Sequence, residues 1–199
     1  VNSWETLSGS VGTISQTGVA EDSELELKFV SALKSISRNN NWTFEKVPDA
    51  DSYRYEMHVI DGDTDIRYYI IPQFALGGHY GVKTYTVADF QIICMSATIN
   101  GIAINTVEKL PMWAIFLDGY AFHAQAPNIR FYGDKDKRDS ISSSLTHKIH
   151  SWTLTWEDIL LFENEKDDSL GLNSVTRLIE LLKNPQEGNL KETAFGCIA

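Results

Sequence analysis

The sequence predicts one α/β domain, with a mixed central β-sheet flanked by helices. Apolar residues recur at helical spacing near both ends of the chain, and segments with strand-like patterns lie between them. The chain has 199 residues, 43% of them hydrophobic, which suffices for one sizeable core and is too little for two comfortable domains. We therefore expect a domain over residues 22–184, after a Ser-, Gly- and Thr-rich linker or arm (residues 1–21) and before a C-terminal tail (residues 185–199).

Four segments have the pattern of helices. The first begins at Asp22 or Ser23, either of which is a good N-cap, and has acidic residues in its first turn. It ends at the asparagines 39–41. The other predicted helices cover residues 134–147, 155–162 and 174–182, and the last has one apolar face formed by Val175, Leu178, Ile179 and Leu182.

The predicted strands lie between the first and second helices, with one more after the second. Residues 52–59 alternate between polar and apolar side chains, which is the period of a half-buried strand. The turn Asp61-Gly62-Asp63 joins them to residues 66–74 in a hairpin. Residues 85–95 form a third strand, residues 96–110 a weaker connection, and residues 112–117 a uniformly apolar central strand. Residues 151–154 form a short last strand.

The composition limits the possible settings and partners. The formal net charge of −10 argues against a domain that holds DNA alone through bulk electrostatics, so another domain or subunit is expected to do most of the binding. The two cysteines form neither a disulfide framework nor a zinc motif, which favours a reducing, cytoplasmic setting. No apolar run is long enough for a membrane span, so no membrane partner is expected. Nothing in the sequence indicates an oligomeric state.

Three acidic residues and one histidine are the candidate site residues. Glu26 leans toward the apolar face of the first helix, Asp89 lies within the third strand, Asp118 ends the apolar strand, and His123 follows five residues later. A carboxylate among apolar neighbours must be paired, protonated or metal-bound. Oxygen ligands from two strands and a helix suit Mg²⁺ or Mn²⁺, which polarises a phosphate and generates hydroxide near neutral pH.

Each candidate also has a structural explanation. Asp89 is equally consistent with a strand aspartate held by backbone or arginine contacts, and Asp118-Gly119 is an ordinary turn dipeptide. His123 on its own is weak evidence, and Glu26 is in a position where acidic residues often interact with the helix dipole.

Four segments in order resemble a known family. Val87-Ala88-Asp89-Phe90 resembles the "PDF" element of PD-(D/E)XK nucleases, and residues 115–123 resemble the strand and turn of the very short patch repair endonucleases. These residues are closer still to the "F-x-D-G-x-x-x-H" segment of a nuclease-like domain at the C-terminus of large bacterial DEAD/DEAH-type helicases. Further matches in that group are the helix opening at residues 23–29, Lys137-Arg138-Asp139, and the segment Trp152–Asp158. The resemblance covers about residues 22–160.

The resemblance implies a restriction-endonuclease-like fold and a metal-dependent DNA nuclease, or a domain derived from one. It implies Asp89 as the principal metal ligand, joined by Asp118 and the backbone carbonyl of Leu117. Glu26, His123 and Asp139 would then be supporting or acid/base groups. The implied partners are DNA and a helicase domain in the same or an associated chain, in phage defence or DNA repair.

The chain departs from the family pattern at two positions. The acidic member of the acidic-x-Lys motif is replaced by Phe116, which cannot bind a metal, and the lysine is replaced by Asp118. The main alternative is therefore a catalytically inactive nuclease-fold module that positions DNA or binds protein. A third hypothesis is a protein-interaction domain with no contact to nucleic acid.

Overall fold

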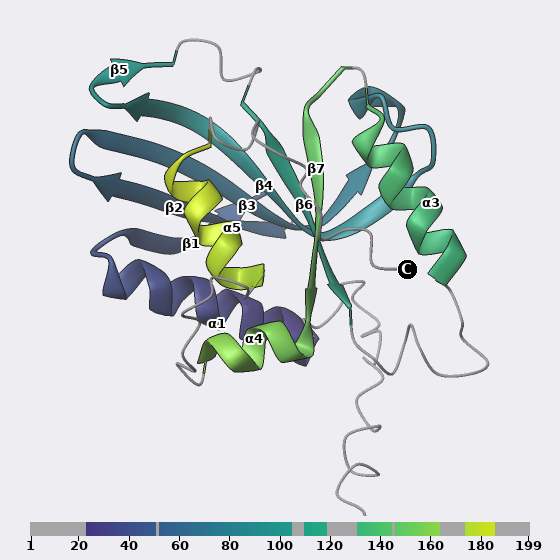
Figure 1. The fold of residues 1–199 in the computed structure, drawn as a ribbon, viewed down its shortest axis with the longest axis horizontal. Coiled ribbons are helices and arrows are strands. Elements are labelled where there is room, and N and C mark those ends of the chain that lie inside the picture. Colours follow the sequence, from purple (N-terminus) through teal and green to yellow (C-terminus); the bar gives the residue numbers. More distant parts are fainter. Residues whose placement is uncertain are drawn as a thin grey trace, which may run out of the picture.

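The computed structural model describes residues 23–50, 52–104, 110–118, 131–144, 146–163 and 174–185. It shows a mixed α/β fold with a seven-stranded open sheet that is mostly antiparallel and has helices packed on it (Figure 1). Along the chain the elements are α1 (Glu24–Asn39), β1 (Thr43–Asp49), β2 (Ser52–Asp61), β3 (Thr64–Leu76), a 3₁₀ turn (Gly78–Tyr80), β4 (Thr86–Ile99), β5 (Ile102–Ala103), β6 (Met112–Asp118), α3 (Phe131–Ser142), β7 (Ile149–Thr155), α4 (Trp156–Glu163) and α5 (Ser174–Lys183).

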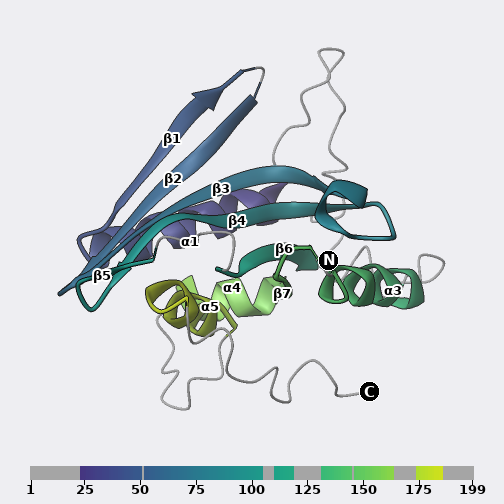
Figure 2. The ribbon, with the colours of Figure 1, turned by 90° about the horizontal axis from the view of Figure 1, so that it is seen from above.

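The sheet has the strand order β1-β2-β3-β4-β6-β7, with the short β5 paired to β4. Among the described strands only β6 and β7 pair in parallel, because α3 provides the crossover that a parallel connection needs. The hairpin of β1 and β2 splays away from the rest of the sheet at one end (Figure 2). The prediction of a mixed sheet flanked by helices is thus confirmed, although only one strand pair is parallel.

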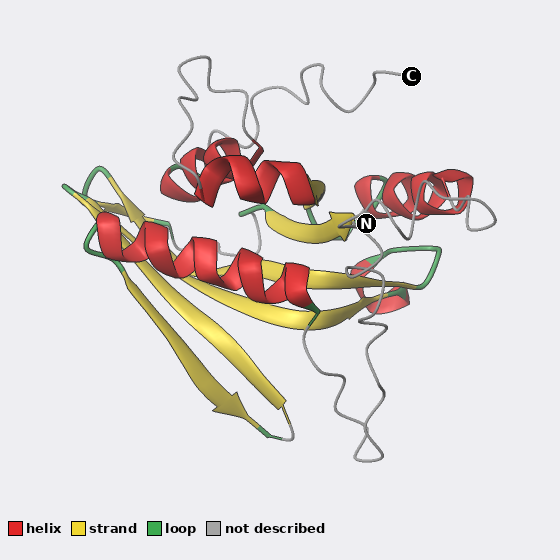
Figure 3. Cartoon of the chain, turned by 90° about the horizontal axis from the view of Figure 1, so that it is seen from below, coloured by secondary structure: helices red, strands yellow, loops and turns green. Residues whose placement is uncertain are grey.

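The helices cover the sheet on different sides. α1 crosses the sheet (Figure 3) and shares the main core with α4 and α5. α3 lies on the opposite side of β6 and β7 (Figure 1), where Ile141 packs in a second, smaller cluster. Side chains alternate along β6 accordingly, with Ile115 in the main core and Ala114 in the second cluster, and both are fully buried. β6 is therefore a central strand covered on both faces, as its sequence predicts.

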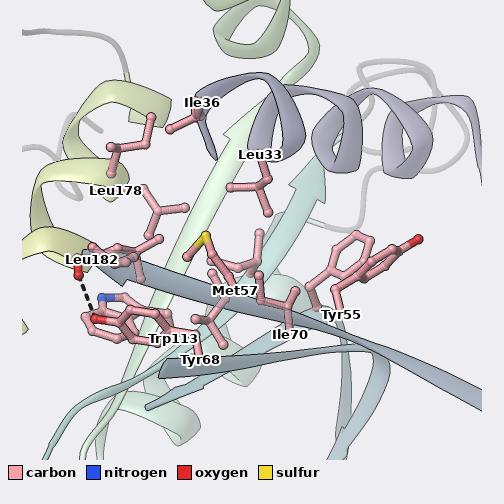
Figure 4. Close-up of a cluster of buried hydrophobic side chains, with 14 of the residues drawn as sticks. Leu33, Ile36, Tyr55, Met57, Tyr68, Ile70, Trp113, Leu178 and Leu182 are labelled. Carbon is pink, nitrogen blue, oxygen red and sulfur yellow. Dashed lines mark hydrogen bonds between the residues drawn. The ribbon is translucent and has the colours of Figure 1, made fainter. Parts of the chain in front are cut away.

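The main core joins segments that are far apart in the chain. Figure 4 shows Tyr68 of β3 and Trp113 of β6 beside residues of α1 and α5. The buried hydroxyl of Tyr68 donates a hydrogen bond of 2.7 Å to the carbonyl oxygen of Leu182 in α5, and burial raises the pKa of this phenol. Cys94 is a free buried cysteine, and burial raises the pKa of its thiol to about 12.

Three sequence predictions of secondary structure need correction. The strand β1 was not expected, because Pro48 and the charged residues around it interrupt the alternation of its sequence. β4 continues to Ile99, into the segment expected to be a weaker connection, and β5 follows within it. The helix predicted over residues 134–147 is α3, which begins at Phe131 and ends at Ser142, where a run of serines, weak helix formers, follows. Across the described residues, no helix is long and apolar enough to cross a membrane.

Candidate functional site

Asp89 lies half-buried in β4 next to the end of β6. Its Oδ2 accepts a hydrogen bond of 2.7 Å from the backbone N–H of Leu117. The backbone register between β4 and β6 covers residues 90–92 and 113–115, so this side chain links the two strands just beyond that register. The hydrogen bond orients the Asp89 carboxylate toward the residue that precedes Asp118 in the chain.

Asp118 is the last residue of β6 and is paired with a cation from α3. Its Oδ2 lies 2.6 Å from Nη2 of Arg138, and the two side chains are 24% and 29% exposed. The same guanidinium lies over the ring of Phe116, with its central carbon 5.5 Å from the ring centroid. Asp118 and Phe116 are two residues apart on β6 and therefore face the same side of the sheet, where α3 packs.

Glu26 reaches the same region from α1. Its Oε2 accepts from the backbone N–H of Ser23 at 2.9 Å, and Ser23 Oγ accepts from the Glu26 N–H at 3.2 Å, which together form a capping box. Its Oε1 accepts a hydrogen bond of 2.8 Å from Nε2 of Gln73 in β3. The half-buried Glu26 is therefore a helix cap that also contacts the sheet.

Gln73 connects Glu26 with the strand that carries Asp89. The ladder between β3 and β4 pairs Pro72 with Phe90 and Phe74 with Ala88, so Gln73 and Asp89 lie between these pairs on adjacent strands. Gln73 has a positive φ of 49°, an uncommon backbone conformation for a residue other than glycine. Such conformations concentrate at functional sites. Glu26 thus contacts β3 beside the strand that carries Asp89, and Asp89 binds the backbone of the residue before Asp118.

Other residues singled out in the sequence have simpler surroundings. Asp139 is exposed on α3 and forms an ion pair of 2.8 Å with Lys135, one turn earlier. Trp152 and Trp156 are half-buried against the main core. His123 lies outside the described residues, so its predicted role stays a prediction.

The donor chemistry of the site suits a hard divalent cation. Mg²⁺ is often held by one or two carboxylates and keeps several waters, and Asp89, Asp118 and the carbonyl oxygen of Leu117 offer ligands of this kind. No cluster of three or more His, Cys, Asp or Glu side chains able to hold a metal occurs among the described residues. Arg138 also already neutralises Asp118. A cation at these three ligands would thus depend on water or substrate oxygens for the rest of its coordination.

The functional reasoning from sequence missed two residues of this site. The sequence assigns no role to Arg138, because its contact with Asp118 spans 20 residues of sequence. Gln73 belongs to no motif, and its link to Glu26 arises from packing α1 on the sheet. The only sequence signal for Arg138 was a cation in a helix that follows the acidic strand.

Comparisons with known proteins found no matching protein family, no similar curated protein and no similar solved structure.

Proposed function

We propose that this domain is a metal-dependent DNA nuclease with a restriction-endonuclease-like core, and that its site lies at Asp89 and Asp118. The observation that carries the proposal is the hydrogen bond from the Leu117 amide to Asp89, which holds the two carboxylate-bearing strand ends together. The succession of α1, an antiparallel β-meander and the crossover from β6 through α3 to β7 also agrees with such a core.

The proposed chemistry is hydrolysis of a phosphodiester bond. Asp89, Asp118 and the Leu117 carbonyl would hold Mg²⁺ or Mn²⁺, and a bound ion of this kind neutralises phosphate charge and lowers the pKa of bound water. Asp89 is oriented by the Leu117 amide, and Glu26 is positioned by Gln73 to assist proton transfer. We place His123 in the same role on the basis of its sequence motif.

The biological setting belongs to the same proposal. We infer a cytoplasmic bacterial protein in which this domain is joined to or associated with a helicase, in phage defence or DNA repair. The net charge of −10 supports a separate DNA-binding partner. An acidic domain is not attracted to phosphates, so it benefits from a partner that holds the DNA while it cleaves.

Two features favour a second candidate function, a catalytically inactive module that positions DNA or binds protein. Phe116 stands where the related nucleases have a metal-binding acid, and Arg138 pairs with Asp118. In this alternative the nuclease fold is retained for its surface, and Asp89 serves to brace β4 against β6.

The deciding experiment measures cleavage of supercoiled plasmid and of a single-stranded oligonucleotide with Mg²⁺ or Mn²⁺. The wild type is compared with Asp89→Asn, which keeps an acceptor for the Leu117 amide and removes the charge. Asp65→Asn is the matched control, since Asp65 is exposed near the opposite end of β3 and pairs with His58. We expect the wild type and the control to cut, and Asp89→Asn to lose at least about a hundredfold in rate.

The other outcomes are also informative. Equal cleavage by wild type and Asp89→Asn would overturn the assignment of the site. DNA binding without cleavage by any of the three proteins would support the inactive module. Neither binding nor cleavage, with the associated helicase present, would exclude both nucleic-acid functions and leave the protein-interaction hypothesis.

A further inference from the structure

Arg138 is the basic side chain that the fold delivers to the carboxylate end of β6. It comes from α3, the crossover helix between β6 and β7, and lies 2.6 Å from Asp118 and above the ring of Phe116. Within the part of the chain that the structure describes, Asp118 is its only hydrogen-bonding partner. The remaining N–H donors of this guanidinium make no hydrogen bond to another described residue, and the side chain is 29% exposed.

We propose that Arg138 is the phosphate-binding residue of this site. Asp118 forms an ion pair with its guanidinium until DNA binds and a phosphate takes the place of Asp118. The inference rests on the proposed function, because it assigns the substrate contact of the same site. A planar guanidinium matches two oxygens of a phosphate as well as it matches a carboxylate. Arg138 can therefore exchange Asp118 for a phosphate without losing its charge-assisted hydrogen bonds.

Phe116 makes this exchange possible. A carboxylate at this position would give the guanidinium a second negative partner and hold it more tightly in the protein. The face of the aromatic ring instead stabilises the cation without accepting hydrogen bonds from the N–H groups of the guanidinium. The ring of Phe116 thus provides a neutral support for a phosphate-binding arginine.

A double-mutant cycle of DNA binding in EDTA tests the proposal without requiring catalysis. Affinity for a short fluorescent duplex and for a single strand is measured at several salt concentrations for wild type, Arg138→Ala, Asp118→Asn and the double variant. Arg138→Ala should weaken binding about tenfold and reduce the salt dependence by about one ion. Asp118→Asn releases Arg138 from its partner and should strengthen binding, and this gain should vanish in the Arg138→Ala background.

Two further variants separate a phosphate contact from a structural ion pair. Arg138→Lys should recover part of the lost affinity, because the charge remains and the planar fork does not. Lys135→Ala removes one positive charge from an exposed position on the same helix and should change affinity far less than Arg138→Ala. If the ion pair were only structural, Arg138→Ala and Asp118→Asn would both lower stability and neither would change the salt dependence.

The results distinguish this inference from the proposed function. Wild-type binding that Arg138→Ala leaves unchanged would overturn the role of Arg138 alone. An equal gain from Asp118→Asn with and without Arg138 would show a general charge effect and would also overturn it. Failure of the wild type to bind either DNA at low salt, with the associated helicase present, would overturn both the inference and the proposed nuclease.

Discussion

Gln91 places a polar side chain in apolar surroundings. It is fully buried in β4, and neither its amide nitrogen nor its amide oxygen has a hydrogen-bonding partner among the described residues. Its register partners on the adjacent strands are Ile71 and Ala114, which offer only apolar side chains. A buried amide without partners costs free energy that a methionine of similar shape would not.

Replacing Gln91 by methionine should therefore leave the free energy of unfolding unchanged or raise it by about 1–3 kcal/mol. Urea unfolding followed by tryptophan fluorescence measures the difference. Gln73→Met is the matched control. Gln73 is exposed and donates a hydrogen bond to Glu26, so the loss of this bond should lower the free energy of unfolding slightly. Clear destabilisation by Gln91→Met would mean that the amide has a partner, such as an ordered water, and would make it a further polar component of the site two residues from Asp89.

The starts of α1 and α4 show where element prediction from sequence succeeds. The capping boxes are visible as Ser23-x-x-Glu26 and as Thr155-x-x-Asp158, in which the aspartate accepts from the Thr155 amide at 2.8 Å. Both helices begin where these motifs predict. Local chemistry of this kind is encoded within a few residues and needs no knowledge of the tertiary fold.

Elements defined by distant contacts were predicted less well. β1 is at the edge of the described sheet, and Pro48 and the charged side chains are tolerated there because β2 is its one neighbour among the described strands. Those same residues hide its pattern in the sequence. At the site, sequence reasoning named Asp89, which accepts from the amide of the residue before Asp118, and Glu26, which contacts β3. Gln73 and Arg138 could not be assigned, because their roles exist only after α1 and α3 have packed on the sheet.

The capping box of α1 allows the structural and chemical roles of Glu26 to be separated. Ser23→Ala removes the side-chain acceptor for the Glu26 amide and should lower stability by about 1 kcal/mol. Glu26→Gln keeps an acceptor for the Ser23 amide and should lower stability by only a few tenths of a kcal/mol. Thermal unfolding followed by circular dichroism measures both changes. A Glu26→Gln variant that is as stable as wild type but cleaves DNA more slowly would give Glu26 a chemical role, and an unchanged rate would restrict it to capping.

At the scale of the whole molecule, one core holds α1, α4 and α5 to the sheet. Leu178 and Leu182 of α5 are buried in the same cluster as Leu33 of α1 and Trp113 of β6 (Figure 4). Tyr68 bonds the α5 backbone across 114 residues of sequence. Because these contacts are shared, α5 should not unfold separately from the sheet, and the predicted domain of residues 22–184 should behave as one cooperative unit.

Leu178→Ala tests this cooperativity. The substitution removes a fully buried side chain and should lower the free energy of unfolding by about 2–5 kcal/mol. Far-ultraviolet circular dichroism, which reports helix content, and tryptophan fluorescence, to which the buried Trp113 contributes, should still give a single coincident transition. Arg177→Ala, a change on the same helix outside the buried set, should have little effect.

If helix signal were lost at a lower urea concentration than the fluorescence transition, α5 would be a detachable element. The minimal folded unit would then end at α4, and the candidate site, which α5 does not contact through any of its described hydrogen bonds, should bind DNA equally well without it.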